Sequence, residues 1–130
     1  LIKRLQPQEF SIHAPKRTAR ECSAVKRYID DNFRHPISLD HLAEISRLNK
    51  YYLAHAFREY IGMSPINYLN ARRVEEACAL LRDTSHPISQ IAGTVGFSSQ
   101  SYFAQVFQKA VGESPGEYRK RIRRDSEKKE

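Results

Sequence analysis

One string of residues occurs twice in this chain, about fifty residues apart. Residues 57–68 and 107–118 both read F-x4-G-x-S-P-x2-Y, and each copy follows a His-Pro-Ile-Ser tetrapeptide, at 35–38 and 86–89. Two copies are too few for a solenoid, which buries a continuous core only by stacking more units. The repeat therefore predicts two subdomains of one design.

Each copy of the repeat has the pattern of a helix pair. In the first copy a short apolar face over 39–45 is followed by Leu53 and Phe57 at helical spacing. In the second copy Phe103 and Phe107 take the equivalent places, and we expect all four side chains to be core. The predicted caps are Ser38, Asn49, Ser64, Ser89, Ser98 or Ser99, and Ser114 at helix starts, and Gly62 and Gly112 at helix ends.

A longer helix is predicted between the two copies. The apolar pattern runs unbroken from Pro65 to Arg82, a length of about 27 Å at the rise of an α-helix. A further amphipathic helix is predicted over 19–33, and the prolines Pro7 and Pro15 predict a linker before it. The predicted fold class is all-α, with seven helices forming two helix-turn-helix subdomains joined by a long linker helix. The predicted boundaries are 1–18 for a connector, 19–64 for the first subdomain, 65–84 for the linker helix, 85–124 for the second subdomain and 125–130 for a tail.

Composition and residue spacing argue against a metalloprotein and a membrane protein, and they say little about a polyanionic partner. The net charge is +7, but residues 36–118 carry 7 basic and 8 acidic side chains, so charge alone is weak support for a polyanionic partner. Cys22 and Cys78 lie outside any C-x-x-C pair, which favours packing roles in a reducing compartment. No histidine pattern is typical of a metal site, and no apolar run approaches the ~20 residues that cross a bilayer. The sequence predicts a cytoplasmic protein with no metal, no cofactor and no membrane contact.

The helix pairs point to DNA because a helix-turn-helix unit presents its second helix to the major groove. That helix must be polar on its outer side, and both copies satisfy this. The outward residues are Asn49, Lys50, Tyr51, Ala54, His55 and Arg58 in the first copy, and Ser99, Gln100, Ser101, Tyr102, Gln105 and Lys109 in the second. Lys50, Arg58 and Lys109 can anchor phosphates, and the linker helix can hold two such helices roughly the ~34 Å apart that successive major-groove segments require.

The chain resembles the C-terminal DNA-binding domain of the AraC/XylS family of transcription regulators over about residues 19–123. The most specific stretch is I-A-x2-V-G-F-S-S-Q-S-Y-F-x3-F-x4-G-x-S-P-x2-Y-R at 91–119. The resemblance implies reading helices near 50–61 and 99–110, and a bacterial regulator that usually activates transcription by touching RNA polymerase. It also implies a missing N-terminal domain that senses a small-molecule effector, and the chain indeed begins without Met.

Site residues carried over by position complete this prediction. Base contacts are predicted for Asn49, Tyr51, Ala54, His55, Gln100, Ser101 and Gln105, and phosphate contacts for Lys50, Arg58, Ser99, Tyr102, Lys109 and Arg119. Three residues depart from the family pattern: His55 and Gln105 stand where many members have Arg, and Arg47 where many have Gly. Because Arg is the usual partner of guanine, we expect A·T-rich contacts and lower affinity.

Two other functions compete with this one, and several side chains have structural interpretations. The chain could be a docking module with an exposed tyrosine patch at Tyr51, Tyr52 and Tyr102, or a fragment of a DNA-repair enzyme. No reactive-cysteine or G-x-S-x-G motif supports an enzyme, and a docking patch has no reason to recur fifty residues apart. We expect Tyr68 and Tyr118 to be buried rings with bonded hydroxyls, and Arg73 to be tied to a helix end or a carboxylate. We therefore predict sequence-specific binding of double-stranded DNA, without enzymatic activity.

Overall fold

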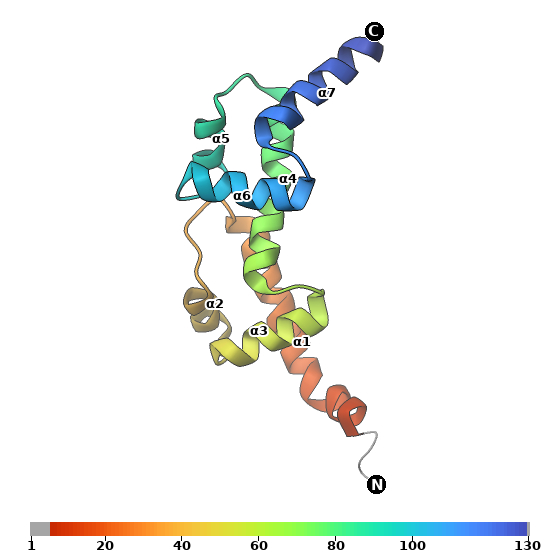
Figure 1. Ribbon diagram of the computed structural model, residues 1–130. Coiled ribbons are helices and arrows are strands. Elements are labelled where there is room, and N and C mark those ends of the chain that lie inside the picture. The colour runs from red at the N-terminus through yellow and green to blue at the C-terminus, as the bar shows by residue number, and fades with distance from the viewer. Residues whose placement is uncertain (1–5, 130) are drawn as a thin grey trace. The chain divides into compact units, whose positions relative to one another are not determined.

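The computed structural model describes residues 6–129, and it confirms the all-α prediction. Over these residues it contains seven helices and no strand (Figure 1). The helices are α1 (Gln6–Asn32), α2 (Leu39–Ser46), α3 (Lys50–Ile61), α4 (Pro65–Asp83), α5 (Ile88–Thr94), α6 (Gln100–Val111) and α7 (Pro115–Lys129).

The chain forms two compact units that follow the repeat. The first unit comprises the chain up to Asp31 together with Ile37–Tyr68, and the second comprises Asn32–Pro36 together with the chain from Leu69 onward. Each unit contains a short helix followed, through a tight turn, by a longer one: α2 and α3 in the first, α5 and α6 in the second (Figure 1). We call α3 and α6 the reading helices.

The N-terminal helix is longer than the sequence pattern predicts. A linker was expected over 1–18, but α1 begins at Gln6, so that prediction is wrong from Gln6 onward; residues 1–5 lie outside the described residues. Pro7 does not prevent this start because it lies in the first turn, where a missing N–H leaves no intrahelical hydrogen bond unmade. Pro15 lies inside the helix, where a sequence pattern normally predicts a break.

Most of the predicted helix caps are confirmed. Each polar cap accepts a hydrogen bond from a backbone N–H of the following turn, as seen for Ser38, Asn49, Ser64, Ser99 and Ser114. At the second Ser-Pro start, Glu117 also accepts from the N–H of Ser114, which completes a reciprocal capping box and lowers the pKa of Glu117. Gly62 and Gly112 end the reading helices with φ of 103° and 93°. One cap is wrong: α5 begins at Ile88, because Pro87 already has the extended N-cap conformation, and Ser89 therefore lies inside the helix.

Each unit has its own apolar core. In the first unit Leu53 and Phe57 of α3 are fully buried, as are Cys22, Val25 and Ile29 of α1. In the second unit Phe103 and Phe107 are fully buried in a cluster whose other members are Val74, Ala77, Leu81, Ile91, Ala92, Val95 and Phe97. All four core predictions for the reading helices are confirmed. The apolar sides of α3 and α6 thus face inward, which leaves their polar sides outward.

Two arginines at equivalent places in the repeat bind the end of the helix that precedes each pair. Arg73 of α4 donates from Nε to the carbonyl of Phe33 (2.7 Å) and from Nη2 to that of His35 (2.9 Å). Arg123, fifty residues later, donates to the carbonyl of Thr84 just beyond α4. The helix-end expectation for Arg73 is confirmed. The two differ in burial, since Arg73 is 7% exposed whereas Arg123 is exposed.

A left-handed turn residue separates the two helices of each pair. The second unit has Gly96 there, with φ of 109°, whereas the first has Arg47, with φ of 61°. Arg47 is the one non-glycine residue with positive φ among the described residues. A side chain in this conformation costs roughly 1 kcal/mol or more, since Cβ crowds the following carbonyl.

Replacing Arg47 with Gly should therefore stabilise the first unit by about 1 kcal/mol. The urea midpoint of unfolding, followed by circular dichroism, measures this. Arg47→Ala is the matched control, because it removes the same charge but keeps Cβ in the strained conformation. A glycine variant no more stable than the alanine variant would contradict the prediction.

Candidate nucleic-acid interface

The outer side of α3 carries the polar residues that the sequence assigned to it. Tyr51, His55 and Arg58 are exposed, and Tyr51 most of all, at 74%. Ala54 is half-buried at the edge of the same side. This surface combines an aromatic ring, an imidazole, a methyl group and one cation, which are groups able to meet base edges and phosphates in a major groove.

The outer side of α6 is equally polar. Gln100, Ser101, Gln105 and Lys109 are all exposed. Gln can form paired hydrogen bonds with adenine, and a serine hydroxyl can donate or accept at any base. Both helices therefore expose hydrogen-bonding groups at equivalent positions of the repeat, although the residue types differ.

Three of the predicted contact residues also have structural roles. The side-chain oxygen of Asn49 accepts from the N–H groups of Tyr51 (2.9 Å) and Tyr52 (3.3 Å), which leaves its amide N–H groups for a ligand. Ser99 accepts from the N–H of Tyr102 (3.1 Å), and its own hydroxyl proton stays free to donate. Two donor groups of Arg119 form hydrogen bonds within the protein. Its Nε and Nη2 donate to carbonyls at the end of α4, those of Leu81 (3.1 Å) and Thr84 (3.2 Å).

Lys50 and His55 lie beside carboxylates. The Nζ of Lys50 is 3.1 Å from Asp40 of α2, and this contact raises the pKa of Lys50 and keeps its charge. His55 Nε2 lies 3.9 Å from Glu59, one turn further along α3. Exposed pairs of this kind contribute only about 0.2–1 kcal/mol, so an approaching phosphate can displace them. Glu59 is an exposed acid on this surface that the sequence prediction did not include.

Each reading helix carries a tyrosine whose hydroxyl is bonded within its own unit. The Tyr52 hydroxyl lies 3.0 Å from Thr18 Oγ1 of α1, and the Tyr102 hydroxyl accepts from Asn70 Nδ2 of α4 at 3.0 Å. The Tyr102 ring also packs edge-on against Phe97, with ring centroids 5.7 Å apart. The sequence alone did not single out Thr18 or Asn70, because nothing in its pattern indicates that they reach these hydroxyls.

The structure offers little support for a reactive or metal-binding site. Cys22 and Cys78 are free thiols, and burial raises the pKa of each, which disfavours the reactive thiolate. Residues 6–129 contain no group of three or more His, Cys, Asp or Glu side chains that could hold a metal ion. None of the helices in that part of the chain is long and apolar enough to cross a bilayer.

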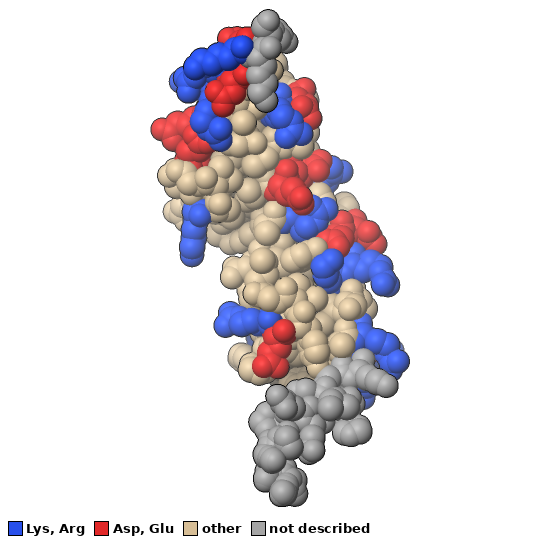
Figure 2. All heavy atoms as spheres, turned by 90° about the vertical axis from the view of Figure 1, so that its right-hand side faces the viewer, with Lys and Arg blue, Asp and Glu red and all other residues tan. Residues whose placement is uncertain are grey.

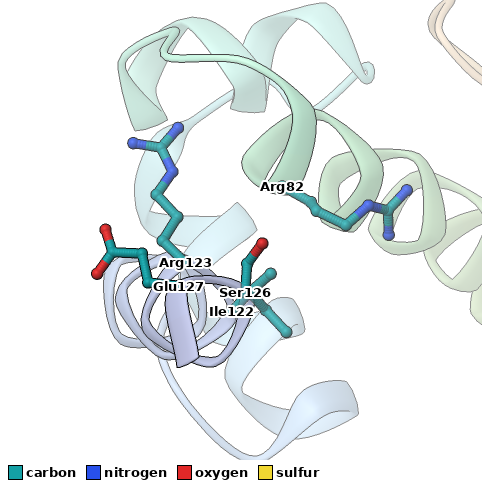
Figure 3. Close-up of a pocket in the computed structure, with 5 residues that line it drawn as sticks. All are labelled: Arg82, Ile122, Arg123, Ser126 and Glu127. Atoms are coloured by element: carbon teal, nitrogen blue, oxygen red, sulfur yellow. The ribbon is translucent and has the colours of Figure 1, made fainter. Parts of the chain in front are cut away.

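A shallow pocket beside α7 is a weak candidate for a ligand site. It is lined by Arg82, Ile122, Arg123, Ser126 and Glu127 (Figure 3). The two guanidinium groups point away from each other in Figure 3, and each already has a partner, Asp83 for Arg82 and the Thr84 carbonyl for Arg123. The pocket therefore does not gather positive charge around one point, as an anion would require.

Surface charge does not mark an interface on the face of the molecule that Figure 2 shows. On the face shown in Figure 2, basic and acidic side chains are interspersed and no broad patch has a single sign. This agrees with the near-neutral centre of the chain. The two polar helix surfaces, rather than net charge, mark the candidate interface.

A short helix, a tight turn and a longer helix with an apolar inner side and a polar outer side define a helix-turn-helix unit, and the described residues contain two of them. A family model described as a helix-turn-helix domain matches residues 42–121. The chain is 34% identical to the regulatory protein SoxS of Escherichia coli K12, over 73% of this chain and 89% of that protein. It is 32% identical to the arabinose operon regulatory protein of the same strain, over 92% of this chain.

A solved structure gives the same result. The C-terminal domain of AraT, a response regulator from Geobacillus stearothermophilus, superposes with a TM-score of 0.73 at 35% identity, covering 77% of this chain and 84% of that one. The chain belongs to the AraC family of helix-turn-helix transcription regulators. It spans 40% of the length of the arabinose operon regulatory protein.

Proposed function

We propose that this chain binds double-stranded DNA in a sequence-specific way, as the DNA-binding part of a bacterial transcription regulator. Each reading helix enters a segment of the major groove, and the two segments are successive. One observation carries the proposal: α3 and α6 bury their apolar sides in their own units and expose hydrogen-bonding groups at equivalent positions. Polar surfaces at equivalent positions of both copies are expected if the two helices bind the same kind of ligand. Two successive segments of the major groove are ligands of the same kind.

The exposed side chains support a division of roles. Base contacts come from Asn49, Tyr51, Ala54 and His55 on one side and from Gln100, Ser101 and Gln105 on the other. Phosphate contacts come from Lys50, Arg58, Ser99, Tyr102 and Lys109. Arg119 is the weakest member of the predicted phosphate set, because two of its donor groups already bind carbonyls. With Gln105 and His55 in place of arginines, we propose a site in which A·T pairs dominate under both helices.

The relatives suggest the setting in which this binding acts. Two of them are named as regulatory proteins, one of them for the arabinose operon. We propose that the whole protein works in the cytoplasm as an activator that also contacts RNA polymerase. A small-molecule effector would act through a further domain, as the greater length of the arabinose operon regulator suggests.

Selection of bound duplexes from a random DNA pool tests the proposal. We expect two short conserved blocks about one helical turn apart. If Lys50, Arg58 and Lys109 each neutralise a phosphate, raising salt from 50 to 200 mM should weaken binding to the selected duplex roughly 40-fold by counterion release. Absence of any enrichment at low salt would overturn the proposal and favour the docking module, for which the exposed Tyr51 is the supporting observation.

A further inference from the structure

Both reading helices have a tyrosine hydroxyl bound by the long helix that comes before the pair. Tyr52 and Tyr102 are equivalent in the repeat, and their partners are Thr18 of α1 and Asn70 of α4. The two contacts have different chemistry. A threonine hydroxyl can donate or accept, whereas Asn70 is placed with its amide nitrogen toward Tyr102 and therefore donates.

The Asn70 contact determines where the Tyr102 proton can go. A phenol has one hydroxyl hydrogen and two acceptor lone pairs. Because the Tyr102 oxygen accepts from Asn70, its hydrogen is left to point at another group. The hydroxyl also interacts electrostatically with the Arg73 guanidinium, but a guanidinium has no acceptor for the hydroxyl hydrogen. The tyrosine is 42% exposed, so its proton has access to a ligand outside the protein.

The surroundings of Tyr102 favour an anionic acceptor. Tyr102 lies in the first turn of α6, where the positive end of the helix dipole attracts negative charge, although its own N–H is capped by Ser99. Packing against Phe97 holds the ring, so the hydroxyl is fixed before a ligand arrives. In the first unit, by contrast, the Tyr52 hydroxyl points at Thr18, which is only 8% exposed. Because either hydroxyl of this pair can donate, the direction of the Tyr52 proton is not set, although Tyr52 is 45% exposed; only the Asn70 contact in the second unit fixes the tyrosine oxygen as an acceptor.

We propose that Asn70 is a positioning residue for DNA binding, which orients the Tyr102 hydroxyl so that it donates to a backbone phosphate. This inference rests on the proposed function. Asn70 itself does not touch the DNA. Its effect passes entirely through Tyr102, and because phosphates carry no sequence information, it changes affinity without changing base preference.

A double-mutant cycle on the duplex selected by the unmodified chain tests this proposal. Tyr102→Phe removes the donor and should weaken binding about 10-fold, the order expected for one hydrogen bond to a charged group. Asn70→Asp can only accept, so it turns the proton inward and should weaken binding to a similar extent. The double variant should bind the duplex with the same affinity as Tyr102→Phe alone, to within about twofold.

Three controls keep the result specific to this role. Asn67→Asp adds the same charge to the exposed side of α4 and should change affinity by less than twofold. Replacing single phosphates of the duplex with neutral methylphosphonates should reveal one position at which Tyr102→Phe no longer matters. Thermal unfolding of every variant checks that the folded fraction is unchanged at the temperature of the binding assay.

Two results would overturn the inference. One is wild-type affinity for Tyr102→Phe, and the other is an Asn70→Asp effect of equal size with and without the Tyr102 hydroxyl, which would indicate simple repulsion of DNA. Failure of the proposed function is a separate result, since it is seen in the unmodified chain as the absence of any selected duplex.

Discussion

Replacing Arg73 with Ala should lower the free energy of unfolding of the second unit by about 3 kcal/mol. The guanidinium is nearly buried and donates to the carbonyls of Phe33 and His35, and it lies over the Phe97 ring at 5.5 Å. Removing it leaves two carbonyls without their partner and a gap beside the ring. Burial lowers the pKa of Arg73, yet the group stays charged at any ordinary pH.

The repeat supplies a matched control for this prediction. Arg123 is the equivalent arginine and donates to the Thr84 carbonyl, but it is exposed, so water can replace it. Arg123→Ala should therefore cost less than about 1 kcal/mol. Urea unfolding followed by circular dichroism measures both variants. If both variants lost the same free energy of unfolding, burial would not determine how much the arginine–carbonyl hydrogen bond stabilises the unit, contrary to our interpretation.

Replacing Gly96 with Ala should destabilise the second unit by about 3 kcal/mol or more. Its φ of 109° is strained for any residue with a Cβ. An added Cβ would also lie 2.6 Å from the Phe33 carbonyl oxygen and 2.7 Å from Arg73 Nε. The methyl group would therefore force apart the same hydrogen bond that Arg73→Ala removes, and the two effects should not be additive.

Gly112 separates strain from crowding in this experiment. Its φ of 93° is equally unfavourable for alanine, but an added Cβ meets nothing within 4 Å. Gly112→Ala should thus lower the free energy of unfolding only by the strain of a Cβ at positive φ, about 1–2 kcal/mol. If both glycine variants lost the same stability by differential scanning calorimetry, the close approach at Gly96 would have no energetic consequence and our account of this turn would be incorrect.

Local chemistry explains which features could be predicted from the sequence. The caps at Ser38, Asn49 and Ser99 follow from a side-chain oxygen next to unpaired N–H groups, and the core positions follow from helical spacing. Such signals lie within a few residues of each other. The early start of α1 was missed because Pro7 and Pro15 dominate the local pattern, and the cap predicted at Ser89 is wrong because Pro87 takes the N-cap position instead.

Contacts between residues far apart in sequence could not be predicted in the same way. The pattern predicted that Arg73 is tied to a helix end or carboxylate, but only the fold identifies the carbonyls of Phe33 and His35, forty and thirty-eight residues away. Asn70 and its contact with Tyr102, thirty-two residues away, gave no sequence signal at all. The outward polar surfaces of α3 and α6 could be predicted, whereas the groups that orient them depend on tertiary packing.

The central claim is that α3 and α6 read separate blocks of one DNA site, and selection repeated with two variants tests it most directly. His55→Ala changes α3, and a combined Ser101→Ala and Gln105→Ala variant changes α6, all at exposed positions that leave the cores intact. We predict that each variant loses base preference in one block only, and that the two lose different blocks. Loss of preference at the same positions in both variants, or in neither, would contradict the claim.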